Sequence, residues 1–309
     1  MGLELAVVGA GRWGSALGGA AARVGHQVTL WSPRSTLGPV RGCTRTTSLT
    51  DLRGRKLFLF TVPPESARAV ARELAPHVGP DALVVHAVRG LTDEPVTTIG
   101  DLLVRETCVR RIGALGGPVL VAELEAGSPS LLVCGSPFPE VLSVTAELFG
   151  GNGVRVVSTP DRRGVEWSSA LVACLALGVG YVQGAGLGPG LVSAITSEAI
   201  REAARLVVAA GGQEATMLGL AGNGDLLAAI AQADRPEIVV GRAVARGRTV
   251  EDAEREIGQR VVASDLVPKL LRWAESRKLS LPLLGALGRG AFSGKPAADV
   301  VREWIDRAL

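Results

Sequence analysis

The sequence is poor in the residues that carry disulfide, metal and proton-transfer chemistry. Its 309 residues include three histidines, one tyrosine and four cysteines, and the cysteines at positions 43, 108, 134 and 174 form no CxxC pair. This spacing argues against a disulfide framework and against a zinc site. We therefore expect reduced thiols, no metal and a cytoplasmic protein.

Lysine is scarce, and long runs of one charge are missing. Of the 33 basic residues only four are lysines, namely Lys56, Lys269, Lys278 and Lys295, so few lysines are available to donate a proton to a substrate. The 33 basic residues against 30 acidic ones give a net charge of +3 without any block of like charges. A nucleic-acid partner is not expected, because such proteins show a basic stripe or cluster.

No hydrophobic run is long enough to predict a membrane span. The longest apolar stretch, residues 170–182, contains Gly178 and Gly180 and is 13 residues long, whereas a span needs about 20. Residues 3–9 lead directly into a glycine turn, without the basic start and cleavage site of a secretory signal. We expect a soluble chain with no membrane insertion.

Hydrophobic residues, at 47%, are plentiful enough for a large core. The length exceeds what one core usually supports, which predicts two domains. In the first half, short apolar runs alternate with amphipathic helical stretches, a pattern typical of a Rossmann-type doubly wound parallel α/β sheet. The expected strands of this half are residues 5–8, 27–31, 57–62, 82–88, 131–134 and 154–157. The expected helices are residues 13–24, 64–74, 93–105 and 140–149.

Helical periodicity dominates after Pro160, which predicts an all-α second domain. We place the domains at residues 1–161 and 162–309. A glycine-rich stretch, residues 178–190, is expected to separate the first two long helices of the second domain.

A GxGxxG string follows the first strand and precedes a helix. In Gly9-Ala10-Gly11-Arg12-Trp13-Gly14, the first glycine permits a tight turn, the second lets the backbone approach a pyrophosphate, and the third lets the helix pack on the strand. This context predicts a dinucleotide site, with Gly9, Gly11, Arg12, Trp13 and Gly14 as cofactor-binding residues. An ordinary strand–turn–helix is the alternative.

The second expected strand is not followed by the carboxylate that normally accepts hydrogen bonds from the ribose hydroxyls of NAD. The chain continues Leu30-Trp31-Ser32-Pro33-Arg34, and the next acidic residue is Asp51. Arg34, together with Ser32, is suited to a 2′-phosphate, so the cofactor is NADP or NAD, with NADP favoured. A solvated loop arginine is the alternative reading of Arg34.

The whole chain resembles the soluble NAD(P)-dependent glycerol-3-phosphate dehydrogenase family. The resemblance is carried most specifically by Gly219-Leu220-Ala221-Gly222-Asn223-Gly224-Asp225-Leu226. The other segments that carry it are residues 9–17, 28–31, 87–91, 117–118 with Glu123, 164–166, 169–171, 257–259 and 281–282. The resemblance implies reversible hydride transfer between the nicotinamide and a small phosphorylated substrate, dihydroxyacetone phosphate or sn-glycerol 3-phosphate. Family members often pair through the helical domain, so a homodimer is expected.

The resemblance also implies roles for single residues. Asp225 matches the family's active-site aspartate, and Arg235 matches its arginine for phosphate and cofactor. Arg89 stands where the family has a lysine at a strand end, so it keeps the charge but not a transferable proton. Gly117 lies in the turn that precedes Glu123 and is a substrate-binding candidate. A helix cap for Asp225 and a surface ion pair for Arg235 are the alternatives.

Several family residues are replaced in this chain. The resemblance places the family's general acid/base lysine at Val172 and its asparagine at Ala173. The other replacements are Ala229 for a threonine, Pro236 for an asparagine, Ser264 and Asp265 for a Glu-Gly pair, and Glu198 for an arginine. A valine can neither stabilise nor protonate an alkoxide, and loss of such a group typically costs about 10²- to 10⁴-fold in rate.

Three hypotheses remain open from the sequence. The first is an active oxidoreductase of this family, and the second is a dinucleotide-binding pseudoenzyme that acts as a sensor or scaffold. The third is a dehydrogenase with a changed substrate that uses His86 as its acid, because His86 ends an expected strand on the ligand side of the sheet. A structural histidine is the alternative reading of His86.

Overall fold

The computed structural model describes residues 2–34, 38–92, 96–151 and 153–308. The chain forms two compact units, Met1–Glu166 and Trp167–Leu309. Each unit has its own hydrophobic core and is described separately below.

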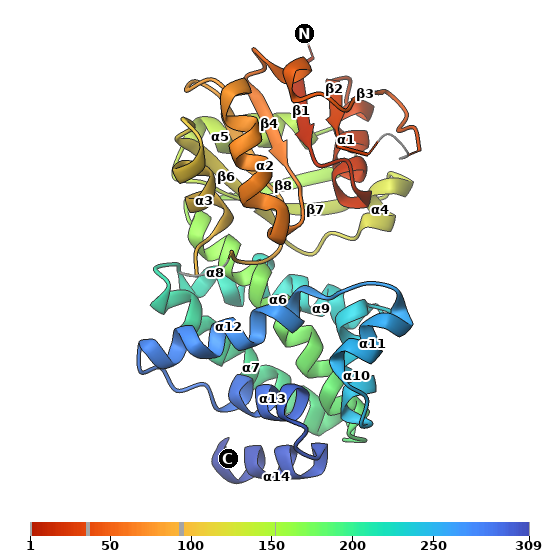
Figure 1. Cartoon of the computed structure of the whole chain (residues 1–309), viewed down its shortest axis with the longest axis vertical. Coiled ribbons are helices and arrows are strands. Elements are labelled where there is room, and N and C mark those ends of the chain that lie inside the picture. The colour runs from red at the N-terminus through yellow and green to blue at the C-terminus, as the bar shows by residue number, and fades with distance from the viewer. Residues whose placement is uncertain (1, 35–37, 93–95, 152, 309) are drawn as a thin grey trace. The chain divides into compact units, whose positions relative to one another are not determined.

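The first unit is built on one eight-stranded sheet (Figure 1). The strand order is β3-β2-β1-β4-β5-β6-β7-β8, and all neighbours are parallel except β6 and β7. This order confirms the doubly wound Rossmann-type prediction, with an antiparallel step that the sequence pattern did not indicate. The strands are β1 (Glu4–Val8), β2 (Gln27–Trp31), β3 (Cys43–Thr46), β4 (Leu57–Phe60), β5 (Leu83–His86), β6 (Arg111–Gly116), β7 (Ser130–Gly135) and β8 (Val154–Thr159).

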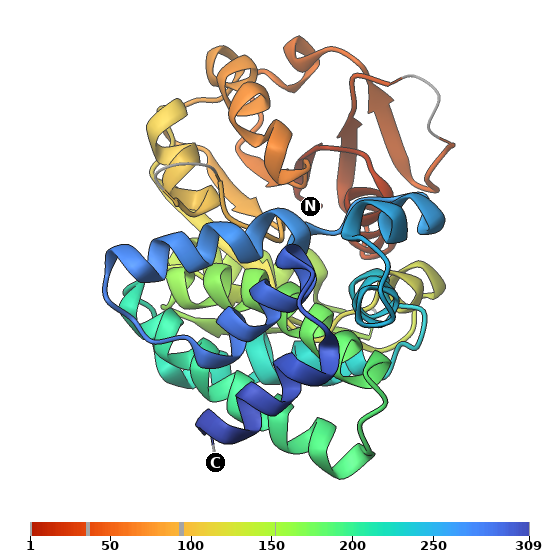
Figure 2. The ribbon, with the colours of Figure 1, turned by 60° about the horizontal axis from the view of Figure 1, so that its bottom comes forward.

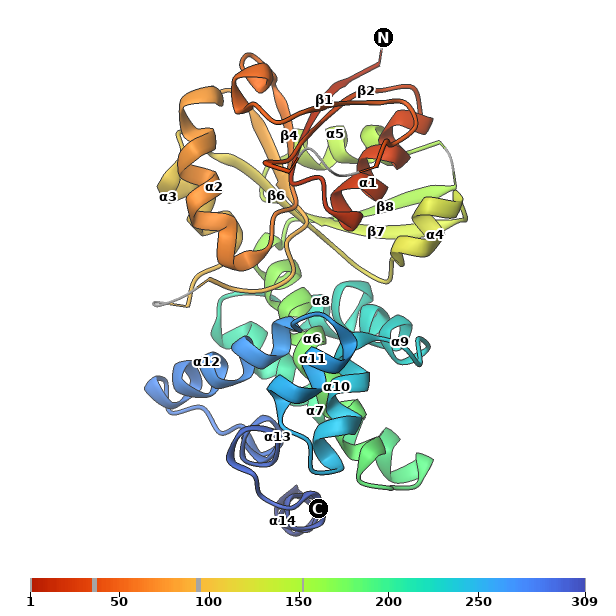
Figure 3. The same cartoon turned by 45° about the vertical axis from the view of Figure 1, so that its right-hand side comes forward.

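Helices cover both faces of the sheet, because successive residues of each central strand point to opposite sides. In β1, Leu5 and Val7 join a core with α1, α4 and α5, whereas Ala6 and Val8 join a core with α2 and α3. Figure 3 shows α2 and α3 on one side of the strands and α1 and α4 on the other. These helices are α1 (Arg12–Arg23), α2 (Ala67–Leu74), α3 (Ile99–Glu106), α4 (Val121–Ala126) and α5 (Pro139–Phe149).

Two strands were missing from the sequence prediction, and their environments explain why. β3 is an edge strand of polar, partly exposed residues, so it lacks an apolar run. β6 contains Gly113, and a glycine within a strand weakens the sequence signal for that strand. A Cβ at Gly113 would lie 2.7 Å from Val141 Cγ1, so the glycine allows α5 to pack closely on the strand.

The second unit is helical, as predicted. The C-terminal helices appear in blue in Figure 2, where α13 and α14 pack against each other. The helices of this half are α6 (Arg162–Gly184), whose first turn lies in the first unit, and α7 (Pro189–Ala209), α8 (Glu214–Leu218), α9 (Asp225–Ile230), α10 (Pro236–Ala245), α11 (Val250–Ile257), α12 (Val262–Ser276), α13 (Pro282–Ser293) and α14 (Ala297–Ala308).

The prediction that residues 178–190 separate two helices is wrong for residues 178–184, because α6 continues without interruption to Gly184. The glycines serve close helix packing instead. A Cβ at Gly180 would lie 2.2 Å from the carbonyl oxygen of Ile238, and one at Gly241 would lie 2.2 Å from that of Leu177. The backbones of α6 and α10 therefore meet where neither helix carries a side chain.

α6 is long and apolar enough to cross a membrane by length and composition alone. In the structure, however, 89% of its most apolar window is buried inside the protein. This burial is what a central core helix shows.

Candidate functional site

The glycine turn after β1 has the backbone geometry that its three glycines predict. Gly9 has φ of 109°, a conformation that L side chains rarely adopt. A Cβ at Gly14 would lie 2.0 Å from the Gly9 carbonyl oxygen, so the third glycine permits α1 to pack against the turn. Around a Cβ at Gly11 there is nothing within 4 Å. The second glycine thus borders open space at the start of a helix.

The N-terminus of α1 is suited to an anion. Gly11 is the residue before the helix, no side chain caps the helix, and its first turn contains no acidic residue. The first N–H groups of a helix lack partners within it and carry the positive end of its dipole. A pyrophosphate is the type of group that such a terminus binds.

Two side-chain hydrogen bonds connect this turn to the neighbouring strands. Thr61, directly after β4, donates its hydroxyl to the carbonyl oxygen of Gly9 at 2.6 Å. Trp13, in the first turn of α1, donates its indole N–H to the carbonyl oxygen of Ala87 after β5 at 3.1 Å. The carboxyl ends of β1, β4 and β5 are therefore held together at the glycine turn. Thr61 is not among the site residues predicted from the sequence, although a polar residue directly after an apolar run is the signal that could have indicated it.

The end of β2 carries no carboxylate. Ser32 is buried, and its hydroxyl oxygen accepts the backbone N–H of Arg34 at 3.2 Å. Arg34 is exposed. The chain thus presents an exposed guanidinium and a hydroxyl at the position where NAD-dependent folds place an acidic residue.

Arg12 and Arg89, two other cofactor candidates, have different surroundings. Arg12 is exposed and forms a two-point ion pair with Glu125 of α4, with N–O distances of 3.3 and 3.1 Å. Arg89 lies half-buried in the segment after β5. The positive charge expected from the resemblance is therefore present near the end of this strand.

Gly117, a substrate-binding candidate, follows β6 with φ of 100°. A Cβ there would lie 3.0 Å from Val133 Cγ2 and 3.1 Å from the backbone nitrogen of Val133. The turn itself therefore requires glycine at this position.

His86 belongs to a buried polar network within the first unit. Its Nε2 lies 2.8 Å from Glu166 Oε1, which also accepts the backbone N–H of Gly100 at 2.7 Å. Both the His86 and the Glu166 side chains are almost fully buried. Among the described residues, His86 Nδ1 and Glu166 Oε2 have no hydrogen-bond partner. This geometry favours a structural role for His86 over proton transfer to a substrate.

The network extends to Asp101 through α6. Arg162 lies 3.4 Å from Glu166 and 2.5 Å from Asp101, and Arg163 lies 2.7 Å from Asp101. Burial alone raises the pKa of Asp101, but the hydrogen bond and ion pairs with these two arginines outweigh it, so the pKa lies below its ordinary value. The start of α6 is thereby fastened to α3 and to the end of β5.

In the helical unit, the glycine-rich block ends in a buried aspartate. Residues Leu220–Gly224 form a π-helical turn, and Asp225 begins α9 with 1% of its surface exposed. A Cβ at Gly222 would lie 2.1 Å from the Met217 carbonyl oxygen, so the tight turn requires glycine. Short π-helical turns are frequent at functional sites.

Arg235 precedes α10, with Pro236 in the first turn of that helix. Its Nε lies 3.0 Å from Glu237 Oε2, and both side chains are largely buried. The guanidinium therefore already has an anionic partner on its own helix. Proline at this position suits a helix start, because its missing N–H would have no partner there.

Three of the seven residues that the resemblance identifies as replacements, Val172, Ala173 and Ala229, are buried and apolar. Val172 and Ala229 are both fully buried and belong to one cluster with Ala176, Leu226 and Ile238. Among the polar replacements, Ser264 donates its hydroxyl to Glu254 at 2.7 Å, whereas Asp265 and Glu198 pair with arginines at the surface.

Comparison with known proteins identifies the family. Residues 43–141 match the model of the NAD-dependent glycerol-3-phosphate dehydrogenase N-terminus, and residues 161–302 match that of its C-terminus. The chain belongs to the NAD-dependent glycerol-3-phosphate dehydrogenase family. It is an oxidoreductase family with a Rossmann domain and NAD(P)-dependent members.

Individual relatives match nearly the whole chain. It is 29% identical to the glycerol-3-phosphate dehydrogenase (NAD(P)+) of Moorella thermoacetica, over 98% of this chain and 96% of the relative. The enzyme of the same name from Thioalkalivibrio sulfidiphilus is 28% identical, over 98% of this chain and 97% of the relative.

Solved structures share the fold. The glycerol-3-phosphate dehydrogenase of Coxiella burnetii superposes with a TM-score of 0.91 at 24% identity, covering 99% of both chains. A ketopantoate reductase from Ralstonia eutropha has a TM-score of 0.61 at 18% identity, covering 99% of this chain and 100% of the other.

Proposed function

We propose that this protein is an NAD(P)-dependent oxidoreductase that transfers hydride between NAD(P)H and dihydroxyacetone phosphate, giving sn-glycerol 3-phosphate, or acts on a related small phosphorylated substrate. The geometry of the glycine turn supports this proposal most directly. The positive φ of Gly9, the open space at Gly11 and the tight packing at Gly14 are what a bound pyrophosphate requires.

The residues of the first unit fit a nicotinamide dinucleotide. The backbone N–H groups at the start of α1 would hold its pyrophosphate, and Trp13 and Thr61 would keep this turn in place through their bonds to Ala87 and Gly9. When bound, the coenzyme supplies or accepts a hydride. Arg34, with Ser32, supports NADP as the favoured coenzyme, because a guanidinium matches a phosphate and a carboxylate does not.

The substrate would be bound and polarised by groups of this chain. Arg235 would hold its phosphate in exchange for the present contact with Glu237, and Asp225 would orient a hydroxyl group. Arg89 would stabilise charge on the reacting oxygen. A guanidinium stays protonated at neutral pH, so the proton for the alcohol product would come from water, and a slow reaction is expected.

Absorbance of NADPH in the presence of dihydroxyacetone phosphate tests this function. We expect slow oxidation that Asp225→Asn abolishes, with binding of NADPH unchanged in that variant. Turnover indistinguishable from buffer would exclude dihydroxyacetone phosphate as the substrate. If NADPH produced no calorimetric signal either, the oxidoreductase proposal itself would be overturned.

A dinucleotide-binding protein without turnover is the second candidate, and the cluster around Val172 favours it. The resemblance places the family's lysine and threonine at Val172 and Ala229, which lie in one buried apolar cluster. This candidate predicts NADP(H) binding without activity on a panel of small carbonyl compounds. Activity gained by Val172→Lys combined with Ala173→Asn would indicate a decayed catalytic site.

The third candidate, a changed substrate with His86 as acid, predicts that His86→Ala abolishes turnover and leaves coenzyme affinity intact. The burial of His86 against Glu166 gives this candidate less support than the other two.

The homodimer and the cytoplasmic location remain predictions. Sedimentation of the purified chain across a range of concentrations would test the dimer.

A further inference from the structure

A cavity of about 80 Å³ lies inside the helical unit, among α6, α7, α13 and α14. It is partly open to solvent. Asp225, Arg235 and Val172 do not line it, so it is separate from the candidate catalytic groups of this unit. Neither the family resemblance nor the proposed function assigns a role to it.

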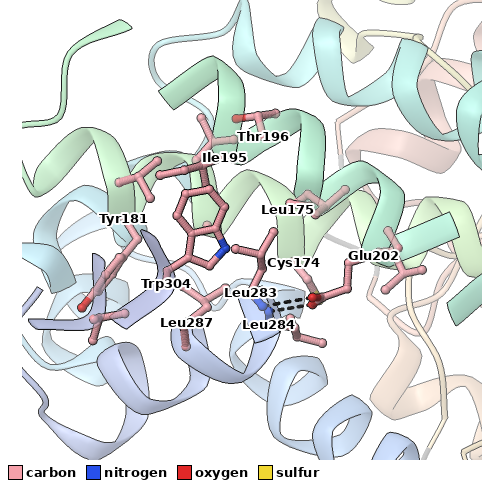
Figure 4. A pocket seen from close by; sticks show the side chains of 18 of the residues that line it. Cys174, Leu175, Tyr181, Ile195, Thr196, Glu202, Leu283, Leu284, Leu287 and Trp304 are labelled. Atoms are coloured by element: carbon pink, nitrogen blue, oxygen red, sulfur yellow. Dashed lines mark hydrogen bonds between the residues drawn. The ribbon is translucent and has the colours of Figure 1, made fainter. Parts of the chain in front are cut away.

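The cavity wall is almost entirely apolar. Leu175, Ile195, Leu283 and Leu287 surround the space, together with the ring of Trp304 (Figure 4). Among the described residues, no lysine, arginine or histidine lines the cavity. An anion would lose its hydration there without gaining a positive partner, which is costly. A cation would find one carboxylate in the wall, that of Glu202, whose two oxygens already accept backbone N–H groups. The lining therefore selects a neutral molecule.

Trp304 carries a buried hydrogen-bond donor. The residue is 4% exposed, and its Nε1 has no hydrogen-bond partner in the described part of the chain. Figure 4 shows the indole within the ring of lining side chains. A buried unsatisfied donor typically costs about 1–3 kcal/mol, so an oxygen acceptor placed in the cavity would remove this penalty.

Glu202 is the acidic residue of the wall, and its carboxylate is already hydrogen-bonded. Its two carboxylate oxygens accept the backbone N–H groups of Leu283 and Leu284 at 3.0 and 2.8 Å, which caps the first turn of α13 (Figure 4). Burial raises the pKa of Glu202 above its ordinary value, although these two N–H groups oppose the shift. Glu202 thus fixes the start of α13 in the wall, and the indole N–H of Trp304 is a buried donor of the lining without a partner among the described residues.

We propose that this cavity binds a neutral aliphatic molecule whose hydroxyl or carbonyl oxygen accepts the indole N–H of Trp304. An apolar cavity of about 150 Å³ accommodates benzene. The present cavity is roughly half that size and partly open to solvent, so it would hold the hydroxyl end of a narrow alkyl chain, and the rest of the chain would extend into the opening. Binding sites of this kind are mostly apolar and contain a few polar groups that fix the orientation of the ligand.

NMR of the full-length protein with 1-hexanol as the probe tests the proposal. The five tryptophans give separate indole N–H signals, and Trp304→Phe identifies the one from Trp304. We expect 1-hexanol to shift this signal saturably. Hexanoate and hexylammonium should bind at least about 10-fold more weakly, because each carries a charge into the apolar wall.

Two variants separate binding in the cavity from general effects of an alcohol. Gly178 lines the cavity, and a Cβ there would make ordinary contact with Leu287 Cδ2 at 3.6 Å, so Gly178→Leu should fold and fill the space. It should weaken 1-hexanol binding by at least about 10-fold. Gly285→Leu, in α13 but outside the lining, should leave binding unchanged.

Removal of the donor gives the last test. In calorimetry, Trp304→Phe should weaken 1-hexanol binding by about 2- to 13-fold, the range expected for one hydrogen bond. Three results would overturn the proposal: no shift of the Trp304 signal at the solubility limit of 1-hexanol, a shift that persists in Gly178→Leu, or a shift that follows protein concentration instead of 1-hexanol. The last result would show that a second copy of the chain occupies the cavity.

Discussion

Val172 of α6 and Ala229 of α9 are buried in the same apolar cluster, although they lie 57 positions apart in the sequence. The family resemblance implies a lysine at the first position and a threonine at the second. The two replacements are therefore coupled in space, since an apolar side chain at one position suits an apolar neighbour at the other. Introduction of the family residue at only one of the two positions should therefore lower the free energy of unfolding.

Val172→Lys should destabilise the protein by about 3 kcal/mol or more, because it places an ammonium group in a dry apolar cluster. Val172→Met, which keeps the position apolar, is the control and should cost less than about 1.5 kcal/mol. Urea unfolding monitored by circular dichroism measures the free energy of unfolding of both variants. Equal midpoints for the two variants would show that water reaches Val172.

Two alanine substitutions in the glycine turn should have different effects. Gly11→Ala should leave the free energy of unfolding nearly unchanged, since its φ is −66° and nothing lies within 4 Å of the new Cβ. It should still reduce NADPH affinity at least about 10-fold by blocking the approach of the pyrophosphate. Gly14→Ala should lower both stability and affinity, because its Cβ would collide with the Gly9 carbonyl. Calorimetry and thermal unfolding distinguish the two effects, and a Gly11→Ala variant with unchanged affinity would contradict the proposed cofactor site.

Arg34→Ala should weaken NADPH binding about 10-fold and leave NADH binding unchanged, because only NADPH carries the 2′-phosphate. Arg53→Ala, at an exposed position outside this loop, is the control. Fluorescence titration with each coenzyme gives the ratio of affinities. An equal loss for both coenzymes would exclude a specific contact between Arg34 and the 2′-phosphate.

Asp101 should contribute to acid sensitivity. Its pKa is lowered in the folded state by Arg162 and Arg163, so its stabilising effect is present above the unfolded value of about 3.9 and is lost as the pH falls through the folded value. Asp101→Asn should be less stable than the parent at pH 6, and the difference should shrink below pH 4. Urea unfolding between pH 2.5 and pH 6 measures this, with the exposed Asp81→Asn as control. A difference that stays constant with pH would contradict the assigned pKa direction.

The sequence predicted the layered architecture because its signals are local. The apolar runs at residues 5–8 and 27–31, followed by a glycine turn and helical spacing, are properties of neighbouring residues. Elements whose stability comes from distant partners were missed. Gly113 of β6 leaves room for Val141 on α5, and Gly180 of α6 leaves room for Ile238 on α10. The role of each glycine therefore depends on a residue far away in the sequence and could not be predicted from its sequence neighbours.

The same division applies to the candidate site. By itself the sequence determined the GxGxxG string after β1 and the absence of an acidic residue directly after β2, since each is a matter of which residue occupies a position. The dinucleotide role of the string and the loss of the family lysine at Val172 are predictions from the same positions. Only the tertiary structure decided that His86 is buried against Glu166 and that Arg235 is paired with Glu237. It also decided that Trp304 lines a cavity and that its indole N–H has no acceptor among the described residues. These facts depend on which side chains meet after burial, and burial is a property of the folded chain as a whole.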